Sequence, residues 1–291
     1  MMPVRLLPFV FVLLWSTGFI AAKYGLPYSG PYTLLAIRFS ITIVLLSAVV
    51  VFLKPSFPQK ISSYGHLLIV GLLIQVAYLG GVFSAIKLGL PAGITAVIVG
   101  AQPVLTVLLI HRFQSKLILL AALFGFIGLI LVIFGTDQLP LQSTISIQNC
   151  IPAIVALLGI TIGTIYQKKY CADISIVVNS FIQFVPTSIA FILLAFAFES
   201  GEEFTIIWHL EFILAISWLV IVLSIGAILL MNLLYQQNSA SSAASYFYLS
   251  PPVTLIMSYV LFGETITMLN LVGITMVILS VYCISQFQDQ R

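Results

Sequence analysis

The sequence predicts an all-α membrane protein in which ten transmembrane helices form two inverted five-helix repeats. Three observations lead to this fold class: an apolar composition, ten apolar stretches of membrane-spanning length, and a pattern that recurs in both halves of the chain. Of the 291 residues, 61% are hydrophobic and only 7% are charged, whereas soluble domains carry roughly 25% charged residues. So few charges cannot cover a water-exposed surface, which indicates a membrane protein.

Ten apolar stretches are separated by short polar or turn-rich segments, and each is close to the ~20 residues that a helix needs to cross a bilayer. They cover residues 6–22, 32–53, 66–86, 92–110, 116–135, 150–167, 174–198, 210–235, 240–262 and 266–286. The first stretch follows Arg5 and ends in Ala21-Ala22, a pattern that also fits a cleaved signal peptide. We interpret it as a retained helix because the internal repeat requires it.

The distribution of Lys and Arg predicts the orientation, since cytoplasmic loops are enriched in these residues. With a cytoplasmic N-terminus, two basic loop residues, Lys23 and Lys87, lie outside, and eight lie inside: Arg5, Lys54, Lys60, Arg112, Lys116, Lys168, Lys169 and Arg291. Ten spans then place both termini in the cytoplasm. Six acidic residues fall on the outer side: Asp137, Glu199, Glu202, Glu203, Glu211 and Glu264.

The two halves of the chain repeat one another at a nearly constant offset. Phe39 aligns with Phe184 at an offset of 145 residues, and Pro103 aligns with Pro252 at an offset of 149. Each match alone is weak because apolar segments align easily, but their shared order indicates a duplication.

The duplication predicts the domain organisation. We expect a first five-helix unit at 1–135, a connecting loop at 136–149 and a second five-helix unit at 150–291. An odd number of spans in each unit reverses the second unit in the bilayer, which gives two inverted halves.

Pro103 and Pro252 interrupt apolar stretches at corresponding positions of the two units. Proline removes a backbone hydrogen bond and bends a helix, and the carbonyl groups that it frees at membrane depth need protein or water as a partner. One such proline fits an ordinary kink. The matched pair predicts two gating hinges around a central cavity.

Four stretches are similar to the drug/metabolite transporter superfamily, and the chain resembles an EamA-type transporter over nearly its whole length. They are "LLWSTGFIAAKYGL", "LLAIRFSIT", "AIKLGLPAGITAVIVGAQPVLTVLL" and "SAASYFYLSPPVTLIMSYVLFGETITMLNLVGITMVILS". The resemblance implies ten helices in two repeats and a carrier in the cell's inner (plasma) membrane that exports amino acids or related metabolites by alternating access. It does not identify the substrate.

Arg38 is the formal charge that lies most clearly inside a predicted span, where a cation is costly unless it faces protein, water or an interface. In a functional role, its guanidinium would bind a substrate carboxylate or hold an outer gate closed. In a structural role, it would pair with backbone carbonyls or lipid phosphate. Both readings stay open.

The predicted substrate-binding residues combine aromatic rings with a few polar groups, as solute pockets usually do. Gln102, which precedes the Pro103 bend, and Trp15, which lies in the middle of its span, are the first choices. The full set is Trp15, Thr17, Arg38, Tyr78, Gln102, Tyr166, Asn232 and Tyr246. For most of them, packing or hydrogen bonding between helices is the competing explanation.

Several other function classes find little support. HExxH and GxSxG motifs and spaced sets of acidic ligands are missing from the sequence, and the three cysteines have no metal-binding spacing. We therefore expect no catalytic residues, metal or cofactor, and the small net charge of +3 does not suggest a nucleic-acid partner. The expected partners are a small-molecule substrate and the lipid bilayer. A non-transporting receptor or assembly protein remains an alternative, an intramembrane enzyme a weaker one, and the oligomeric state is not predicted.

Overall fold

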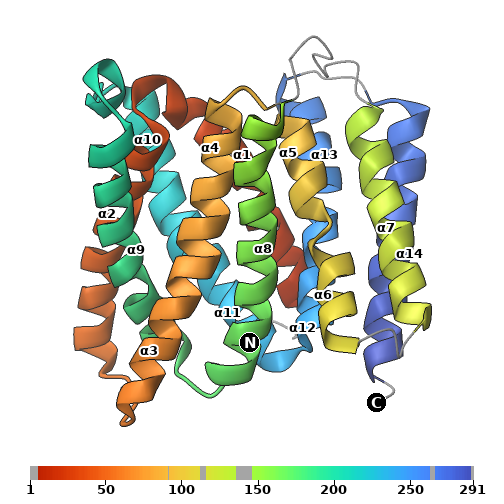
Figure 1. Cartoon of the computed structure of the whole chain (residues 1–291), viewed down its shortest axis with the longest axis horizontal. Coiled ribbons are helices and arrows are strands. Elements are labelled where there is room, and N and C mark those ends of the chain that lie inside the picture. The colour runs from red at the N-terminus through yellow and green to blue at the C-terminus, as the bar shows by residue number, and fades with distance from the viewer. Residues whose placement is uncertain (1–5, 91, 112–115, 136–145, 263–265, 290–291) are drawn as a thin grey trace.

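The computed structural model describes residues 6–90, 92–111, 116–135, 146–262 and 266–289. The secondary structure within these ranges is helical, without strands, and ten successive helical rods run up and down one bundle (Figure 1). Each rod coincides with one of the ten predicted apolar stretches, so the all-helical prediction is confirmed for the described residues. Because the number of rods is even, the first rod begins and the last rod ends at the same end of the bundle, the lower end in Figure 1.

Five rods come from the first half of the chain, and the third and fourth of them are irregular. The rods are α1 (Leu7–Gly25), followed by a short η2 turn (Leu26–Tyr28); α2 (Pro31–Leu53); a continuous α3 (Ile61–Val70), η3 (Gly71–Gly80) and α4 (Gly81–Lys87); α5 (Ala92–Gly100) and α6 (Gln102–His111); and α7 (Lys116–Phe134).

The second half repeats this order. Its rods are α8 (Ile147–Tyr170); α9 (Ile176–Phe198), followed by the η4 turn (Gly201–Phe204); a continuous α10 (Leu210–Trp218), η5 (Leu219–Ala227) and α11 (Ile228–Gln237); α12 (Ala240–Ser245), η6 (Tyr246–Leu249) and α13 (Ser250–Phe262); and α14 (Met268–Asp289). α8 begins with a capping box, in which Ser146 Oγ accepts from the Asn149 amide and Asn149 Oδ1 accepts from the Ser146 amide.

Seven of the described helices are long and apolar enough to cross a membrane. They are Pro31–Leu53, Ile61–Lys87, Lys116–Phe134, Ile147–Tyr170, Ile176–Phe198, Leu210–Gln237 and Met268–Gln286. Two shorter apolar helices, Leu7–Gly18 and Ile94–Ile110, belong to the first rod and the α5–α6 rod. The chain is therefore a multi-pass membrane protein by the length and composition of its helices.

The rods are arranged so that corresponding helices of the two halves meet at the edges of the bundle. α2 packs against α9 at one edge, and α7 packs against α14 at the other (Figure 1). α7 and α14 approach closely at Gly128 and Gly273, where a side chain on either glycine would meet the backbone of the opposite helix within 3 Å. Small residues let apolar helices pack this tightly without a polar contact.

The first helix of each half packs mainly on the other half. α1 contacts α10, η5, α11 and α13, whereas α8 contacts α3, η3, α4, α5 and α6. Gly159 and Gly163 of α8 lie against η3, where an added Cβ would meet the Leu73 carbonyl oxygen and the Ile74 side chain within 3 Å. The GxxxG spacing of α8 thus serves packing within the chain.

The third rod of each half contains a π-helical segment, and the two segments begin 148 residues apart, at Gly71 and Leu219. π-helical turns have wider i→i+5 hydrogen bonding and occur often at functional sites. At the start of η3, an added Cβ on Gly71 would lie 2.6 Å from the Gln183 carbonyl oxygen of α9. Only glycine fits this contact.

Glu199, one of the six acidic residues predicted on the outer side, is buried and caps a helix. Its carboxylate accepts from the Tyr32 amide at 2.5 Å, from the Thr33 amide at 2.9 Å and from the Thr33 hydroxyl at 2.6 Å, and the residue is 5% exposed. It caps the N-terminus of α2, where a negative charge is favourable. Of the other predicted outer acids, Glu211 bonds Tyr28, and Asp137, Glu264 and the side chains of Glu202 and Glu203 lie outside the described part.

Candidate functional site

A cavity lies inside the bundle, between the two broken rods, α5–α6 and η6–α13, and the helices α1, η3, α4, α7 and α8. It is lined by Trp15, Tyr78, Val82, Ile86, Thr95, Ala96, Val99, Gly100, Gln102, Pro103, Leu129, Ile160, Phe247, Tyr248, Ser250 and Pro251. Its volume is about 70 Å³, whereas small-molecule sites usually measure roughly 300–1,000 Å³. The cavity has room for a few water molecules, so a metabolite requires the helices to move apart.

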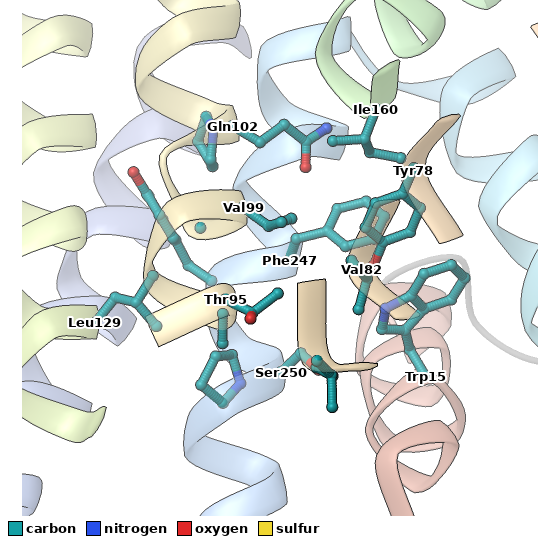
Figure 2. A pocket seen from close by; sticks show the side chains of 16 residues that line it. Trp15, Tyr78, Val82, Thr95, Val99, Gln102, Leu129, Ile160, Phe247 and Ser250 are labelled. Carbon is teal, nitrogen blue, oxygen red and sulfur yellow. The ribbon is translucent and has the colours of Figure 1, made fainter. Parts of the chain in front are cut away.

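Aromatic rings from three rods converge on this cavity (Figure 2). The rings of Trp15 and Tyr78 are nearly parallel, with centroids 6.4 Å apart. Phe247 meets Trp15 edge to face at 5.3 Å. Such rings offer an apolar surface that accepts the body of an amphipathic solute.

Few polar groups face the cavity. Gln102 stands at the break between α5 and α6, and its Nε2 donates to Thr164 Oγ1 at 3.2 Å. On the other broken rod, the lining residue Ser250 of α13 accepts a hydrogen bond through its carbonyl oxygen from Ser16 Oγ of α1 at 3.2 Å. Figure 2 shows Thr95 as a further polar side chain on the wall.

The two breaks have the same local cause. Ala101 interrupts the rod between α5 and α6, and Pro103 sits in the first turn of α6; η6 interrupts the corresponding rod, and Pro251 and Pro252 sit in the first turn of α13. Proline fits the first turn of a helix because that turn has no hydrogen-bond acceptor for its missing N–H. The prolines therefore begin new helices rather than kink continuous ones.

Arg38 lies behind the cavity wall rather than on it. The side chain is 5% exposed, its Nε donates to Ser224 Oγ of η5 at 2.8 Å, and its guanidinium carbon lies 5.2 Å from the centroid of the Phe39 ring. Placing Arg at the centre of a transmembrane helix costs about 3 kcal/mol on insertion scales.

A network of neutral polar side chains closes the bundle below the level of Gln102. Thr164 Oγ1 lies 3.2 Å from the Tyr235 hydroxyl. One turn further along, Gln167 Nε2 donates to Asn232 Oδ1, and Asn232 Nδ2 donates to Ser180 Oγ at 2.6 Å. These bonds tie α8, α11 and α9 together, and they connect to α6 through Gln102.

The remaining predicted residues lie outside the cavity lining. Thr17 accepts from Trp218 Nε1 at 2.9 Å beside a separate groove between α1 and α10. Tyr166 is 2.7 Å from His66 Nδ1, and Asn232 belongs to the polar network. Tyr246 packs at the edge of the hydrophobic core, and Pro252 is buried next to the lining residue Pro251.

Four of the ten predicted site and hinge residues line the cavity: Trp15, Tyr78, Gln102 and Pro103. The prediction missed Phe247 and chose its neighbour Tyr246, because the 3₁₀ turn at Tyr246–Leu249 changes which side chains face inward. It also missed Ser250 and Thr95. A small polar residue directly before a proline pair is a signal that could have identified Ser250.

Among the described residues, no group of three or more His, Cys, Asp and Glu side chains is placed to hold a metal ion. The cavity lining likewise contains no acidic, basic or histidine side chain. The site therefore offers aromatic surface, hydroxyl and amide groups rather than acid–base or metal chemistry.

Apolar helices of membrane-spanning length, with broken helices around an internal cavity, are the architecture of a membrane transporter. The sequence comparison agrees: the model of the EamA-like transporter family matches residues 3–136 and again residues 150–286. The chain belongs to this family.

Named relatives match almost the whole chain at low identity. A Salmonella typhimurium protein named "Probable amino-acid metabolite efflux pump" is 27% identical, covering 93% of this chain and 91% of the relative. "Uncharacterized transporter YvbV" of Bacillus subtilis is 24% identical over 93% of this chain and 87% of its own. "Uncharacterized inner membrane transporter YedA" of Escherichia coli K12 is 23% identical over 95% and 89%.

A solved structure titled "Crystal structure of protein" is similar over 98% of each chain, with a TM-score of 0.77 and 17% identity. This likeness concerns the fold alone.

Proposed function

We propose that the chain is a secondary transporter that moves a small amphipathic metabolite, an amino acid or a related compound, out of the cell by alternating access. The observation that carries this proposal is the cavity between two helices that break at corresponding positions. Relatives named as amino-acid metabolite efflux pumps support the substrate class and the direction.

Two inverted units, residues 1–135 and 150–291 joined by 136–149, are part of this proposal. Three features support it: the π-helical segments and the broken rods recur in the same order, equivalent glycines of α7 and α14 face each other, and the family model matches once in each half. The exchanged packing of α1 and α8 is also what a twofold axis in the membrane plane would produce.

Alternating access then consists of opening one end of the bundle while the other stays closed. The cavity reaches Ile86 and Thr95, close to the ends of α4 and α5, whereas the Gln102–Thr164–Tyr235 contacts close the opposite side. Pro103 and Pro252 act as the hinges at which α6 and α13 tilt.

In the open state, the remaining predicted residues would line the opposite half of the path. Tyr166 and Asn232 lie on the closed side of the Gln102 level, and Tyr246 lies one residue before the cavity-lining Phe247. Thr17, beside the α1–α10 groove, would become accessible when α1 moves.

The closed end of the bundle is the cytoplasmic end in this proposal. The loops and helix ends on that side hold eight Lys and Arg residues, and those on the other side hold Lys23 and Lys87. Both termini then lie in the cytoplasm. The name of the relative YedA supports an inner membrane.

Flux measurements with cysteine labelling test the proposal. Purified protein in proteoliposomes is screened with labelled amino acids and related metabolites, with and without a pH gradient. In a variant whose three native cysteines are serines, Val99→Cys on the cavity wall should react with a membrane-impermeant maleimide and be protected by the transported solute. Val44→Cys, on the lipid-facing side of α2, is the matched control and should not be protected, since Val44 is 69% exposed outside the cavity.

If the solute is transported but does not protect Val99→Cys from the maleimide, the transport path does not pass through this cavity. Solute binding without flux would favour a receptor over a transporter.

A further inference from the structure

A groove separate from the cavity runs along the surface of the bundle between α1 and α10. Its volume is about 360 Å³, several times that of the cavity. α1 separates the two spaces, because Trp15 lines the cavity and Thr17 lines the groove, and residues two positions apart lie on nearly opposite sides of an α-helix. The groove is therefore a second site on the molecule.

The groove has a floor of small side chains and walls of large ones. Ala21 of α1 and Ala215 of α10 are buried at its base, whereas Tyr24, Leu214 and Trp218 are exposed beside them. The two alanines leave room that the neighbouring large side chains border. An apolar chain laid over the alanines would contact these walls on both sides.

This side of α10 faces the hydrocarbon of the bilayer. Leu210, Leu214 and Trp218 recur every four residues, and all three are exposed. Residues at this spacing lie on one face of a helix, and in a membrane-spanning chain an exposed apolar face contacts lipid tails. From Glu211 to Trp218 the helix rises about 10 Å. The groove thus has the position and the surface of a site for an acyl chain.

A carboxylate lies at one end of the groove. Glu211 belongs to the first turn of α10, and its Oε2 accepts an exposed hydrogen bond from the Tyr28 hydroxyl at 2.6 Å. A carboxylate has about four acceptor positions, so this bond leaves others for a ligand. Because the other lining residues are apolar or neutral, the groove fits a molecule with a cationic group at Glu211 and an apolar body.

His209 adds a hydrogen-bond donor at the same end. Its Nδ1 accepts from the Glu211 amide at 3.5 Å, and its ring stacks on Tyr28 with centroids 5.3 Å apart. With Nδ1 as the acceptor, a neutral imidazole carries its proton on Nε2, and this exposed ring can donate it to a phosphate oxygen. An ammonium group and a phosphate are the two charged groups of a phosphoethanolamine headgroup.

We propose that the groove binds one phospholipid with a primary amine headgroup, phosphatidylethanolamine. The ammonium group lies on Glu211, the phosphate lies beside His209, and one acyl chain lies over Ala21 and Ala215. A primary ammonium group has three N–H donors, whereas the trimethylammonium group of phosphatidylcholine has none and phosphatidylglycerol has no cation. This inference requires only that the chain lies in a bilayer, so it stands apart from the proposed transport activity.

Native mass spectrometry of the full-length protein, stripped of lipid in detergent, tests the headgroup preference. Dioleoyl forms of phosphatidylethanolamine, phosphatidylcholine and phosphatidylglycerol are titrated, and the affinity of the first bound lipid is measured. We expect phosphatidylethanolamine to bind about tenfold or more tightly than the other two, because only its headgroup donates to the carboxylate. Equal affinities, or a preference for either of the other lipids, would overturn the proposal.

The variant Glu211→Gln removes the negative charge and should bring the three affinities within about twofold of one another. Asp173→Asn is the matched control, because Asp173 is also an exposed acid but lies between α8 and α9. It should keep the preference for phosphatidylethanolamine. A preference that survives Glu211→Gln would refute the role of this carboxylate.

Filling the groove tests the acyl-chain site. Ala21→Leu places a larger side chain on the floor and should weaken binding of all three lipids about tenfold. Ala197→Leu, at an exposed position of α9, is the control and should leave the affinities unchanged. If Ala21→Leu does not fold, Trp218→Ala removes an exposed wall instead and should cause a similar loss. Unchanged affinities in the groove variant would reject this site.

Two further results would assign the groove to a different occupant and reject the proposal. Glycerophosphoethanolamine has the headgroup without acyl chains, and its binding as tightly as the lipid would indicate a site for a soluble amine. A dimer in the same spectra that is lost in Ala21→Leu would indicate that a second copy of the chain covers the groove.

Discussion

The carboxylate of Glu199 joins the end of α9 to the start of α2, and its replacement by glutamine should measurably destabilise the fold. The three donors are the amide groups of Tyr32 and Thr33 and the Thr33 hydroxyl, at 2.5–2.9 Å. A glutamine keeps one acceptor oxygen, but its NH₂ group then faces backbone N–H donors at a buried site. Hydrogen bonds to charged groups contribute about 1.5–3 kcal/mol each, so the loss of one or two predicts about 1.5–6 kcal/mol.

This loss converts into a shift of the melting temperature. For chains of 150–250 residues, 1 kcal/mol corresponds to about 2–4 °C, and a 291-residue chain falls at or below the lower end of that range. Glu199→Gln should therefore lower the Tm in detergent by about 3–12 °C, measured by intrinsic fluorescence.

Glu211→Gln is the control for this experiment, because Glu211 accepts a single, solvent-exposed hydrogen bond from Tyr28, and exposed polar pairs contribute about 0–1 kcal/mol. Its Tm should fall by less than about 2 °C. Equal shifts for the two variants, or a Glu199→Gln protein that melts with the unmodified chain, would refute the reasoning.

Three further predictions concern packing, thiol reactivity and solute binding. Gly128→Ala should cost about 1–3 kcal/mol because its Cβ would meet the backbone of α14 within 3 Å, whereas Gly65→Ala, which has open space, should be neutral or stabilising; equal Tm values would contradict this. Burial raises the pKa of Cys171 to about 11, so the thiol stays neutral below that pH. The rate of maleimide labelling at Cys171, measured by mass spectrometry, should therefore rise about tenfold per pH unit from pH 7 to 10. A normal thiol would instead reach a plateau near pH 9. Trp15→Ala should weaken solute binding about tenfold or more in calorimetry, unlike Trp208→Ala, whose side chain is 62% exposed and does not line the cavity. Equal losses would argue against the cavity.

The sequence was sufficient to locate the helices because the bilayer requirement acts on every one of them. The second rod was predicted at 32–53 and lies at Pro31–Leu53, and the ninth was predicted at 240–262 and spans Ala240–Phe262. A run of about 20 apolar residues between polar breaks has few other structures available in a membrane.

Irregular backbone within a rod is harder to predict than the rod itself. The π-helical segments at Gly71–Gly80 and Leu219–Ala227 leave the apolar composition unchanged, so no periodic signal marks them. They depend on contacts with other helices, such as that of Gly71 with the Gln183 carbonyl oxygen.

Trp15, Tyr78 and Gln102 were predicted because they are aromatic or polar residues within apolar stretches, and they line the cavity although Tyr78 lies in η3 and Gln102 at the break after Ala101. Phe247 lies within a 3₁₀ turn, where counting by the α-helical period fails. Glu199 follows α9 directly in an acidic segment, and only the three-dimensional approach of α2 gives it a buried role.

The exchange of α1 and α8 between the halves has a consequence for biosynthesis. When the first five helices have left the ribosome, α1 still lacks α10, η5 and α13, on which it packs, and the cavity lacks the wall that Phe247, Ser250 and Pro251 supply. The early helices must therefore wait in the lipid until translation of the later ones is complete. A gene split within residues 136–145 should yield active protein only when both fragments are made in the same cell.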